Sequence, residues 1–230
     1  MPKINFKDIE GKEKGKIGFV CGLGPSLTPY LNKFKEMIKE KEKYVFFSCN
    51  EVDEKSGLHP DYWVFANNES IVPLYYNKVN EAKSTLVYAY SVDLTPYEKV
   101  DELIETDYIA YSERENLLKD KEETIQTFFQ NLSGNEEKYS CAGTVAVHML
   151  STAVITGCNP IYVVGVDMDY RKGYCDGSKT GRIGWLSKNI PNLENSFRVI
   201  KESAENIGIE IYNLNLEAPY ESLEKKKLFL

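Results

Sequence analysis

The sequence predicts a single α/β domain over residues 1–230, with a Rossmann-like, mostly parallel sheet and helices on both of its faces. Three observations lead to this prediction. Short apolar runs, typical of strands buried on both faces, alternate with helical segments. The first run leads directly into a glycine turn and a helix. Several runs end in asparagine or aspartate, and the carboxyl ends of parallel strands are where such sheets bind ligands.

Composition excludes several classes of protein. The chain has 28 Lys and Arg against 35 Asp and Glu, a net charge of −7, which argues against a general nucleic-acid binder. No apolar run approaches the roughly 18–20 residues of a transmembrane helix, and the charged N-terminus lacks a signal-peptide core. The five cysteines are scattered and form no C-x-x-C pair, so we expect free thiols and a cytoplasmic protein.

The stretch KIGFVCGLGPSL, residues 16–27, starts the sheet. Its apolar run Ile17–Val20 predicts the first strand, and the spacing over residues 27–41 predicts a helix. The dinucleotide fingerprint would need glycine where Leu27 stands, and no Walker lysine follows. An NAD site and a Walker-type site are therefore disfavoured.

The turn between that strand and that helix still suits an anion. Gly22 and Gly24 permit positive φ and close approach of the backbone, and Pro25 fits the first position of a helix. Ser26 adds a hydroxyl beside the unpaired amides at the positive end of the helix dipole. We therefore predict a nucleotide phosphate at this turn, with a plain strand-to-helix connection as the alternative.

Asparagines follow the next two predicted strands. Asn50 follows the strand 44–49, and Asn67 and Asn68 follow the strand 62–66; a fourth strand is predicted over 86–90. Asparagine can donate to and accept from ribose hydroxyls and base edges, so these residues are candidate nucleotide contacts. The alternative is that they only shape turns.

The second half of the chain also contains a turn that leads into a helix, followed by a buried strand with a polar end. Ser140, Ala142 and Gly143 belong to a small-residue turn, which leads to an apolar helix over 144–156 that begins at Thr144. A buried strand over 161–166 follows and ends at Asp167 and Asp169. The turn is a second helix N-terminus able to bind phosphate.

The remaining segments receive coarser predictions. Residues 1–15 are interpreted as a poorly ordered lead-in, residues 93–137 as a helical insertion, and residues 171–190 as a lid loop. A helix over 192–208 and a strand over 209–212 complete the domain, and the tail from residue 217 is interpreted as helical.

These motifs together resemble a known family. The sequences GLGPSL, H-P-D-Y-x-V and S-C-A-G-T-V-A…G-C-N-P-I-Y-V-V-G-V-D resemble those of Maf-type (motility accessory factor) proteins, a family that includes flagellin glycosyltransferases. More distantly, they are similar to bacterial sialyltransferases that use CMP-sialic acid. The resemblance covers about residues 16–215 and fits poorly over 93–137.

The resemblance implies a glycosyltransferase that takes a sugar, such as a nonulosonic acid, from a CMP-linked donor. Gly22, Gly24, Pro25 and Ser26 would then meet the phosphate or ribose, Asn50 the nucleotide, and Asn67 or Asn68 the sugar. Residues 140–144 would meet the nucleotide as well. Tyr170 and Tyr174 correspond to the tyrosines that stabilise the leaving phosphate in the sialyltransferases, a role that requires no metal.

The chain departs from that pattern at the general base. The sialyltransferases carry a histidine where Trp185 stands here, and of the two histidines His59 lies in a turn and His148 in an apolar helix. Asp167, Asp169 or Asp176 could remove the proton from an acceptor hydroxyl instead. Asp167 and Asp169 also form a D-x-D pair, which could hold Mg²⁺ if the reaction uses a metal.

The sequence thus favours a cytoplasmic glycosyltransferase that needs no cofactor, with a nucleotide sugar as donor and a glycan or protein as acceptor. Two alternatives stay open: a pterin-type diphosphokinase that uses ATP and Mg²⁺, and a nucleotide-binding protein without catalysis. The sequence leaves open the donor sugar, the stereochemical outcome and the formation of an oligomer.

Overall fold

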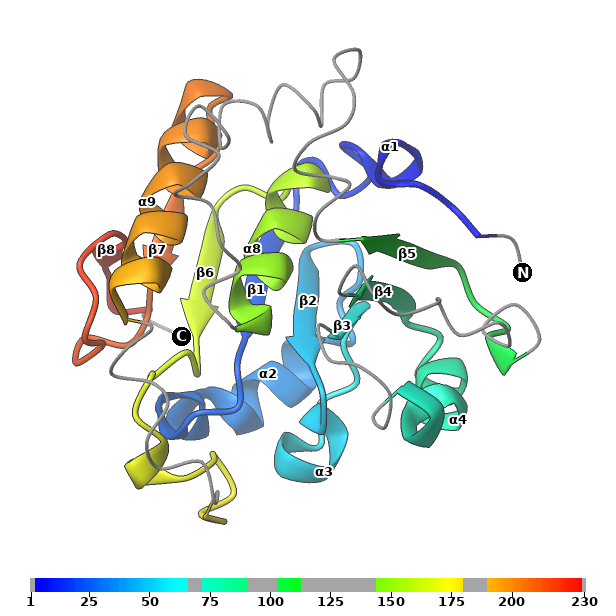
Figure 1. Cartoon of the computed structure of the whole chain (residues 1–230), viewed down its shortest axis with the longest axis horizontal. Helices are drawn as coiled ribbons and strands as arrows, with labels where there is room; N and C mark the ends of the chain where they lie inside the picture. The colour runs from blue at the N-terminus through cyan, green and yellow to red at the C-terminus, as the bar shows by residue number, and fades with distance from the viewer. Residues whose placement is uncertain (1–2, 66–71, 91–102, 113–143, 180–189, 229–230) are drawn as a thin grey trace.

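The computed structural model describes residues 3–65, 72–90, 103–112, 144–179 and 190–228 (Figure 1). Its centre is an eight-stranded sheet in which every pairing is parallel. The strands are β1 (Ile17–Cys21), β2 (Tyr44–Cys49), β3 (Tyr62–Phe65), β4 (Thr85–Tyr90), β5 (Tyr108–Ser112), β6 (Ile161–Val164), β7 (Ile211–Asn213) and β8 (Glu224–Lys225). The sheet confirms the predicted Rossmann-like α/β class.

Helices of very different lengths precede or connect these strands. They are α1 (Phe6–Ile9), the 3-10 helix η1 (Pro25–Tyr30), α2 (Leu31–Met37), α3 (Val52–Ser56), α4 (Val72–Ala82), α8 (Val145–Ile155), the 3-10 helix η2 (Tyr170–Lys172) and α9 (Ile190–Asn206). In the part of the chain that the structure describes, no helix combines the length and the apolar character that a membrane span needs.

The strand order places a ligand crevice in the middle of the sheet. The order is β5-β4-β3-β2-β1-β6-β7-β8, so the chain builds outward from β1 to β5 and then returns to β6 on the other side of β1. In doubly wound sheets the crevice lies at such a reversal, beyond the carboxyl ends of the strands. Here the reversal lies between β1 and β6, and the segments that follow these two strands flank it.

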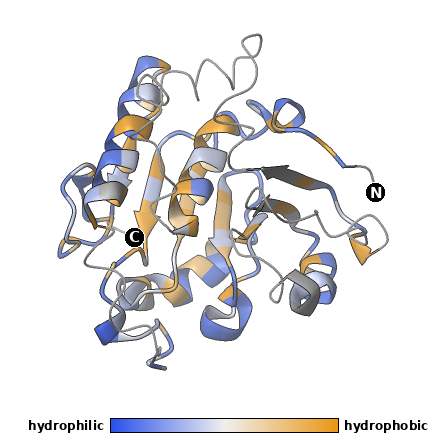
Figure 2. Ribbon diagram, viewed as in Figure 1, coloured by the Kyte–Doolittle hydropathy of each residue, from blue (hydrophilic) through white to orange (hydrophobic). Residues whose placement is uncertain are grey.

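Aromatic side chains and one apolar helix form much of the core. Phe19 on β1 stacks on Phe46 of β2 and Tyr162 of β6, with ring centroids 5.0 and 5.6 Å apart, and Phe34 of α2 packs on Phe19. Helix α8 lies across β1, β2 and β3 beside α9, and Figure 1 shows these two helices in front of the sheet. Figure 2 shows apolar residues gathered on central strands such as β6 and polar residues on peripheral helices such as α3 and α9.

Most predicted strands and helices are present with small shifts of their ends. Strand β2 has the predicted bounds, and β1, β3, β4, β6 and β7 differ by one to two residues at an end. Helix α8 begins after Thr144, which is its N-cap, and Gly157 follows it with φ +81°, as expected of a glycine at a helix C-terminus. His148 is buried in α8, as its apolar neighbours indicated.

Three predictions on the terminal and central segments were wrong. Residues Phe6 and Ile9 of the supposed lead-in are buried in α1, and Gly11 and Glu13 donate to carbonyls at the end of α8. Within the supposed helical insertion, residues 108–112 form β5, which pairs in parallel with β4 at the edge of the sheet, and both Tyr108 and Ile109 are buried. The tail forms the short strand β8 beside β7 and not a helix.

The first crossover also differs from the prediction. The helix expected over 27–41 is a 3-10 helix followed by the seven-residue α2, with Pro29 inside the 3-10 part. Proline removes a backbone donor, which disfavours a continuous α-helix there. Pro25 does occupy the first turn of η1, as predicted. Residues 93–102 and 113–137 of the insertion and residues 180–189 of the predicted lid lie outside the described residues.

Candidate functional site

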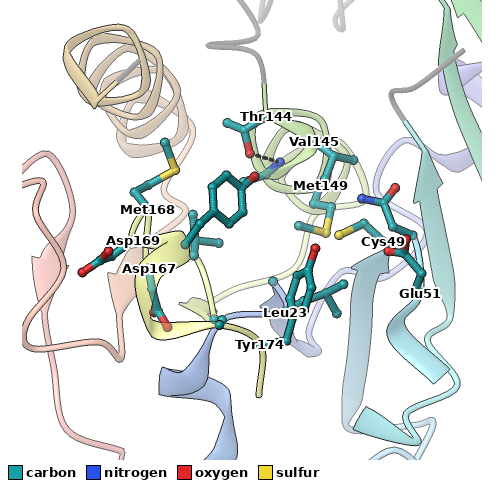
Figure 3. A pocket seen from close by; sticks show the side chains of 18 residues that line it. Leu23, Cys49, Glu51, Thr144, Val145, Met149, Asp167, Met168, Asp169 and Tyr174 are labelled. Atoms are coloured by element: carbon teal, nitrogen blue, oxygen red, sulfur yellow. Dashed lines mark hydrogen bonds between the residues drawn. The ribbon is translucent and has the colours of Figure 1, made fainter. Parts of the chain in front are cut away.

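A pocket lies at the reversal point of the sheet (Figure 3). Its walls are the segments after β1, β2 and β6, the N-terminus of α8, and the loop that contains η2. The lining residues are Gly22, Leu23, Gly24, Cys49, Asn50, Glu51, Thr144, Val145, Ala146, Met149, Gly165, Val166, Asp167, Met168, Asp169, Tyr170, Gly173 and Tyr174. The pocket therefore brings together eight of the predicted site residues: Gly22, Gly24, Asn50, Thr144, Asp167, Asp169, Tyr170 and Tyr174.

The two glycines after β1 allow the loops of β1 and β6 to touch. A Cβ on Gly22 would lie 2.3 Å from the carbonyl oxygen of Gly165, and one on Gly24 would lie 2.4 Å from Asp167 Oδ2. The amide of Gly24 donates to the Gly165 carbonyl at 2.8 Å. Neither Gly22 nor Gly24 has positive φ, whereas Gly165 has φ +71°. Close packing of two protein loops is thus the visible reason for both glycines.

The backbone amide and hydroxyl of Ser26, which were predicted from the sequence to bind a phosphate, form hydrogen bonds within the protein. The amide donates to Asp167 Oδ2 at 2.8 Å, and the hydroxyl donates to Asp167 Oδ1. The same hydroxyl accepts from the amide of Gly165 at 2.9 Å. Pro25 and Ser26 do not line the pocket. At the start of η1, a carboxylate of the chain itself therefore occupies the position of the expected anion.

Asp167 joins three strand ends. Besides the two contacts from Ser26, its Oδ1 accepts from Asn215 Nδ2 at 2.8 Å, and Asn215 lies just beyond β7. Its side chain is largely buried, and both oxygens already accept hydrogen bonds. This carboxylate thus links the segments that follow β1, β6 and β7.

Asp169 is bound differently. It forms a two-point contact with Arg171, at 2.7 Å to Nε and 3.0 Å to Nη2, and also accepts from the Arg171 amide. The Arg171 hydrogen bonds hold the pKa of Asp169 below its usual value, which makes it a weak base. Among the described residues no group of three His, Cys, Asp or Glu is placed to hold a metal ion.

The N-terminus of α8 lies in the wall of the pocket. Thr144 caps this eleven-residue helix by accepting from the Ala146 amide at 3.3 Å, and Thr144, Val145 and Ala146 all line the cavity. The first N–H groups of a helix and its dipole attract anions. None of the lining residues in the described part of the pocket is a lysine or arginine. The helix terminus is thus the main positive feature of this wall.

Tyr174 points into the cavity from a tightly held loop. Figure 3 shows its ring beside Leu23 and its hydroxyl directed toward Met149 and Cys49, while the Asp169 carboxylate is turned away. Its amide donates to the Ser178 carbonyl at 2.9 Å, and the Lys55 ammonium lies 5.1 Å from its ring centroid. Lys55 also binds Ser178 Oγ at 2.8 Å and lies 3.4 Å from Asp176. Contacts from α3 thereby fix the position of Tyr174.

The end of β2 forms the opposite wall. Asn50 has φ +48°, a left-handed conformation that asparagine tolerates, and its carbonyl accepts from Trp63 Nε1 at 2.9 Å. Its Oδ1 is buried without a hydrogen-bond partner among the described residues. Glu51 follows it and also lines the pocket. Burial, followed by the charge of Glu51, raises the pKa of the Cys49 thiol well above its usual value.

Five predicted contacts lie outside the described residues: Asn67, Asn68, Ser140, Ala142 and Gly143. Sequence reasoning in turn missed Glu51 and Asn215. Both stand two positions beyond a strand, at the carboxyl edge of the sheet, so the rule that singled out Asn50 would have found them if extended by one residue. Met149 was missed because it lies on a helix that is apolar on every face.

Comparison with known proteins agrees with the fold. A Maf glycosyltransferase from Magnetospirillum magneticum AMB-1 is similar in structure, with 14% identity and a TM-score of 0.52; the match covers 98% of this chain and 39% of that one. This chain thus spans well under half of that protein. The likeness confirms the resemblance to Maf-type proteins at the level of the fold.

Two weaker matches come from Campylobacter jejuni. The sialyltransferase CstII, solved in complex with cytidine-5'-monophosphate, has 14% identity and a TM-score of 0.46, over 94% of this chain and 89% of that one. An alpha-2,3-sialyltransferase in apo form has 17% identity and the same TM-score, over 94% of this chain and 84% of that one. No curated protein matches the sequence.

The family comparison is more specific than the structural one. The model of the family described as 6-hydroxymethylpterin diphosphokinase MptE-like matches residues 1–173, which is well over half of the 230 residues. The matched range contains β1 to β6, the N-terminus of α8, and both aspartates of the pocket. The chain belongs to the MptE-like family.

Proposed function

We propose that this protein transfers a sugar from a CMP-linked donor to a hydroxyl group of a glycan or protein acceptor. The observation that carries the proposal is the anion-binding capacity of the pocket. The eleven-residue helix α8 has its N-terminus in the pocket wall, while the amide and hydroxyl of Ser26 are donated to Asp167. A single helix N-terminus suits the one phosphate of a CMP-sugar.

The tyrosines supply the second part of the argument. Tyr170 and Tyr174 line the same pocket as the N-terminus of α8. A phosphate bound at that terminus would therefore share the cavity with both tyrosines. When the bond between sugar and phosphate breaks, negative charge grows on the phosphate oxygens. Hydroxyl donors and helix amides stabilise that charge without a metal. The Maf glycosyltransferase shares the fold, which is compatible with this chemistry.

The family name favours a second candidate, pyrophosphate transfer from ATP to a hydroxymethylpterin. That reaction calls for Mg²⁺ bound by carboxylates beside the phosphates. Asp167 and Asp169 are the two aspartates of the pocket, yet Asp167 accepts from Ser26 and Asn215, and Asp169 is paired with Arg171. The arrangement of these two side chains therefore favours the CMP-sugar.

Thermal denaturation with nucleotides tests the choice. The panel is CMP, UDP, GDP and ATP, each with and without Mg²⁺. A ligand present at about a hundred times its Kd should stabilise the protein by about 2.7 kcal/mol. We expect CMP to raise Tm without Mg²⁺. A shift with ATP and Mg²⁺ only would favour the diphosphokinase, and no shift with any nucleotide would contradict both candidates.

A matched pair of variants tests the leaving-group role. Tyr174→Phe should lower turnover of a CMP-sugar by about 100-fold, since loss of one donor to a developing oxyanion has effects of that size. It should leave the Tm shift with CMP nearly unchanged. Tyr30→Phe, a change on η1 outside the pocket, is the control and should retain full turnover. Equal losses of CMP binding and turnover in Tyr174→Phe would contradict the assignment.

A further inference from the structure

The pocket contains a carboxylate that the proposed function has not used. Its three acidic lining residues are Asp167, Asp169 and Glu51. Hydrogen bonds to the rest of the chain occupy the first, and the Arg171 ion pair occupies the second. For the Glu51 carboxylate, no partner is present among the described residues. Figure 3 shows Glu51 on the β2 side of the cavity, across from both aspartates.

Charged side chains of α3 form ion pairs with Lys78 of α4, and none of these pairs includes Glu51. Asp53 and Glu54 share Lys78, at 3.1 and 2.8 Å. The Lys55 ammonium binds Ser178 and Asp176 and lies over the ring of Tyr174. Burial, followed by the charges of Glu51 and Glu54, raises the pKa of Tyr75 to about 12, so this phenol stays neutral.

The backbone that carries Glu51 is firmly held. Trp63 Nε1 donates to the carbonyl of Asn50 at 2.9 Å, and the Lys55 amide donates to the carbonyl of Glu51 at 2.9 Å. Glu51 stands directly before α3, so its position follows from the sheet and not from a long loop. Cys49 and Met149, whose side chains are apolar, line the pocket together with Glu51.

We infer that Glu51 is the general base of this site and takes the proton from the acceptor hydroxyl. The inference rests on the proposed function, in which an acceptor hydroxyl attacks a donor bound at α8. The acceptor O–H bond breaks, its proton passes to a carboxylate oxygen of Glu51, and the acceptor oxygen bonds to the anomeric carbon. The bond from that carbon to the donor phosphate breaks, and its electron pair leaves on the phosphate of CMP.

This role supplies the group that the sequence lacks. The histidine found in the sialyltransferases is replaced by Trp185, and the three aspartates considered as substitutes are Asp167, Asp169 and Asp176. Asp176 accepts from the Ser178 amide and hydroxyl at 2.9 and 2.6 Å, so all three are engaged within the chain. Glu51 is the acidic lining residue for which the described contacts leave both oxygens to a substrate.

The test compares Glu51→Gln and Glu51→Asp with Glu54→Gln. Glu54 lies on α3, which begins directly after Glu51, and its carboxylate binds Lys78. The substrates are CMP-N-acetylneuraminic acid and a galactoside acceptor, and release of CMP is followed from pH 4 to pH 9. Loss of a general base lowers rates by about 10²–10⁴-fold. We expect Glu51→Gln to lose at least 100-fold in kcat and the acidic limb of the pH profile, with an unchanged Tm shift by CMP.

The other variants and a second pair of substrates make the result decisive. Glu51→Asp should recover part of kcat, and Glu54→Gln should match the wild type. A Glu51→Gln enzyme within threefold of wild type, or one that loses CMP binding in parallel with kcat, would overturn the assignment. If the wild type does not use the CMP-sugar, the same variants are assayed with ATP, Mg²⁺ and 6-hydroxymethylpterin, whose hydroxyl also loses a proton. A loss of turnover by Glu51→Gln in that assay supports Glu51 as general base and overturns the CMP-sugar as donor. If the wild type shows no turnover in either assay, both the role of Glu51 and the proposed function are overturned.

Discussion

Asp167 shows at the scale of one residue that a side chain in a motif typical of catalysis can also make contacts between distant parts of the chain. Its oxygens accept from the Ser26 amide and from Asn215 Nδ2, both at 2.8 Å, and from the Ser26 hydroxyl. These partners lie 141 and 48 residues away in the sequence. In the sequence, Asp167 and Asp169 form a D-x-D motif because they are close in the chain. In the fold, Asp167 bonds to distant residues, which no local sequence pattern can indicate.

Replacement of this aspartate should therefore cost stability. In Asp167→Asn an NH₂ group replaces one acceptor oxygen. In either orientation of the amide, this NH₂ group faces a hydrogen-bond donor, so we expect a loss of about 1–3 kcal/mol in the free energy of unfolding. Asp169→Asn is the control, because an exposed ion pair such as Asp169–Arg171 contributes about 0–1 kcal/mol. Urea denaturation measures both. A loss in Asp167→Asn no greater than in Asp169→Asn would show that the three contacts do not hold the loops together.

At the scale of elements, the sequence was most informative where burial is complete. Strands such as β2 and β6 are mostly apolar runs, and α8 is apolar with a threonine cap, so their positions could be predicted. The edge strand β5 was misread because its sequence, YIAYS, lies within a polar stretch and a helical period could be fitted across it. Two residues of β8 are too few for any period.

The loop that follows η2 is an element whose stability should depend on pH. Hydrogen bonds from Ser178, with a smaller contribution from Lys55, hold the pKa of Asp176 below its ordinary value. A carboxyl whose folded pKa is depressed stabilises the protein above its unfolded pKa of about 3.9, and that stabilisation is lost as the pH falls through the folded value. Asp176→Asn should thus be less stable than wild type at pH 7, with the difference shrinking below about pH 4.

A second variant tests how much of this pH dependence comes from the hydroxyl of Ser178. Ser178→Ala removes the hydroxyl that donates to Asp176 at 2.6 Å, although the amide contact at 2.9 Å remains. It should therefore weaken the pH dependence without abolishing it. Urea denaturation of the three proteins between pH 7 and pH 3 provides the comparison. A difference between wild type and Asp176→Asn that stays constant over this range would contradict the ionic contribution.

At the scale of the whole molecule, the prediction of a single domain can be tested with two cysteines at opposite edges of the sheet. Cys21 ends β1 at the carboxyl edge, and Cys158 precedes β6 at the amino edge. Both are fully buried, and burial raises the pKa of Cys158 to about 12 and that of Cys21 further. Because only an exposed thiolate reacts with iodoacetamide, native labelling of either residue requires the sheet to open.

If the chain is one cooperative domain, both cysteines become accessible in the same unfolding event. We therefore expect Cys21 and Cys158 to be alkylated slowly at pH 8 and at the same rate, and rapidly in concentrated urea. Peptide mass spectrometry over a time course measures the two rates separately. Equal rates would show that the β1–β6 reversal opens as a unit with the rest of the sheet. Faster labelling of Cys21 alone would mean that the carboxyl edge, which carries the pocket, opens locally while the amino edge stays folded.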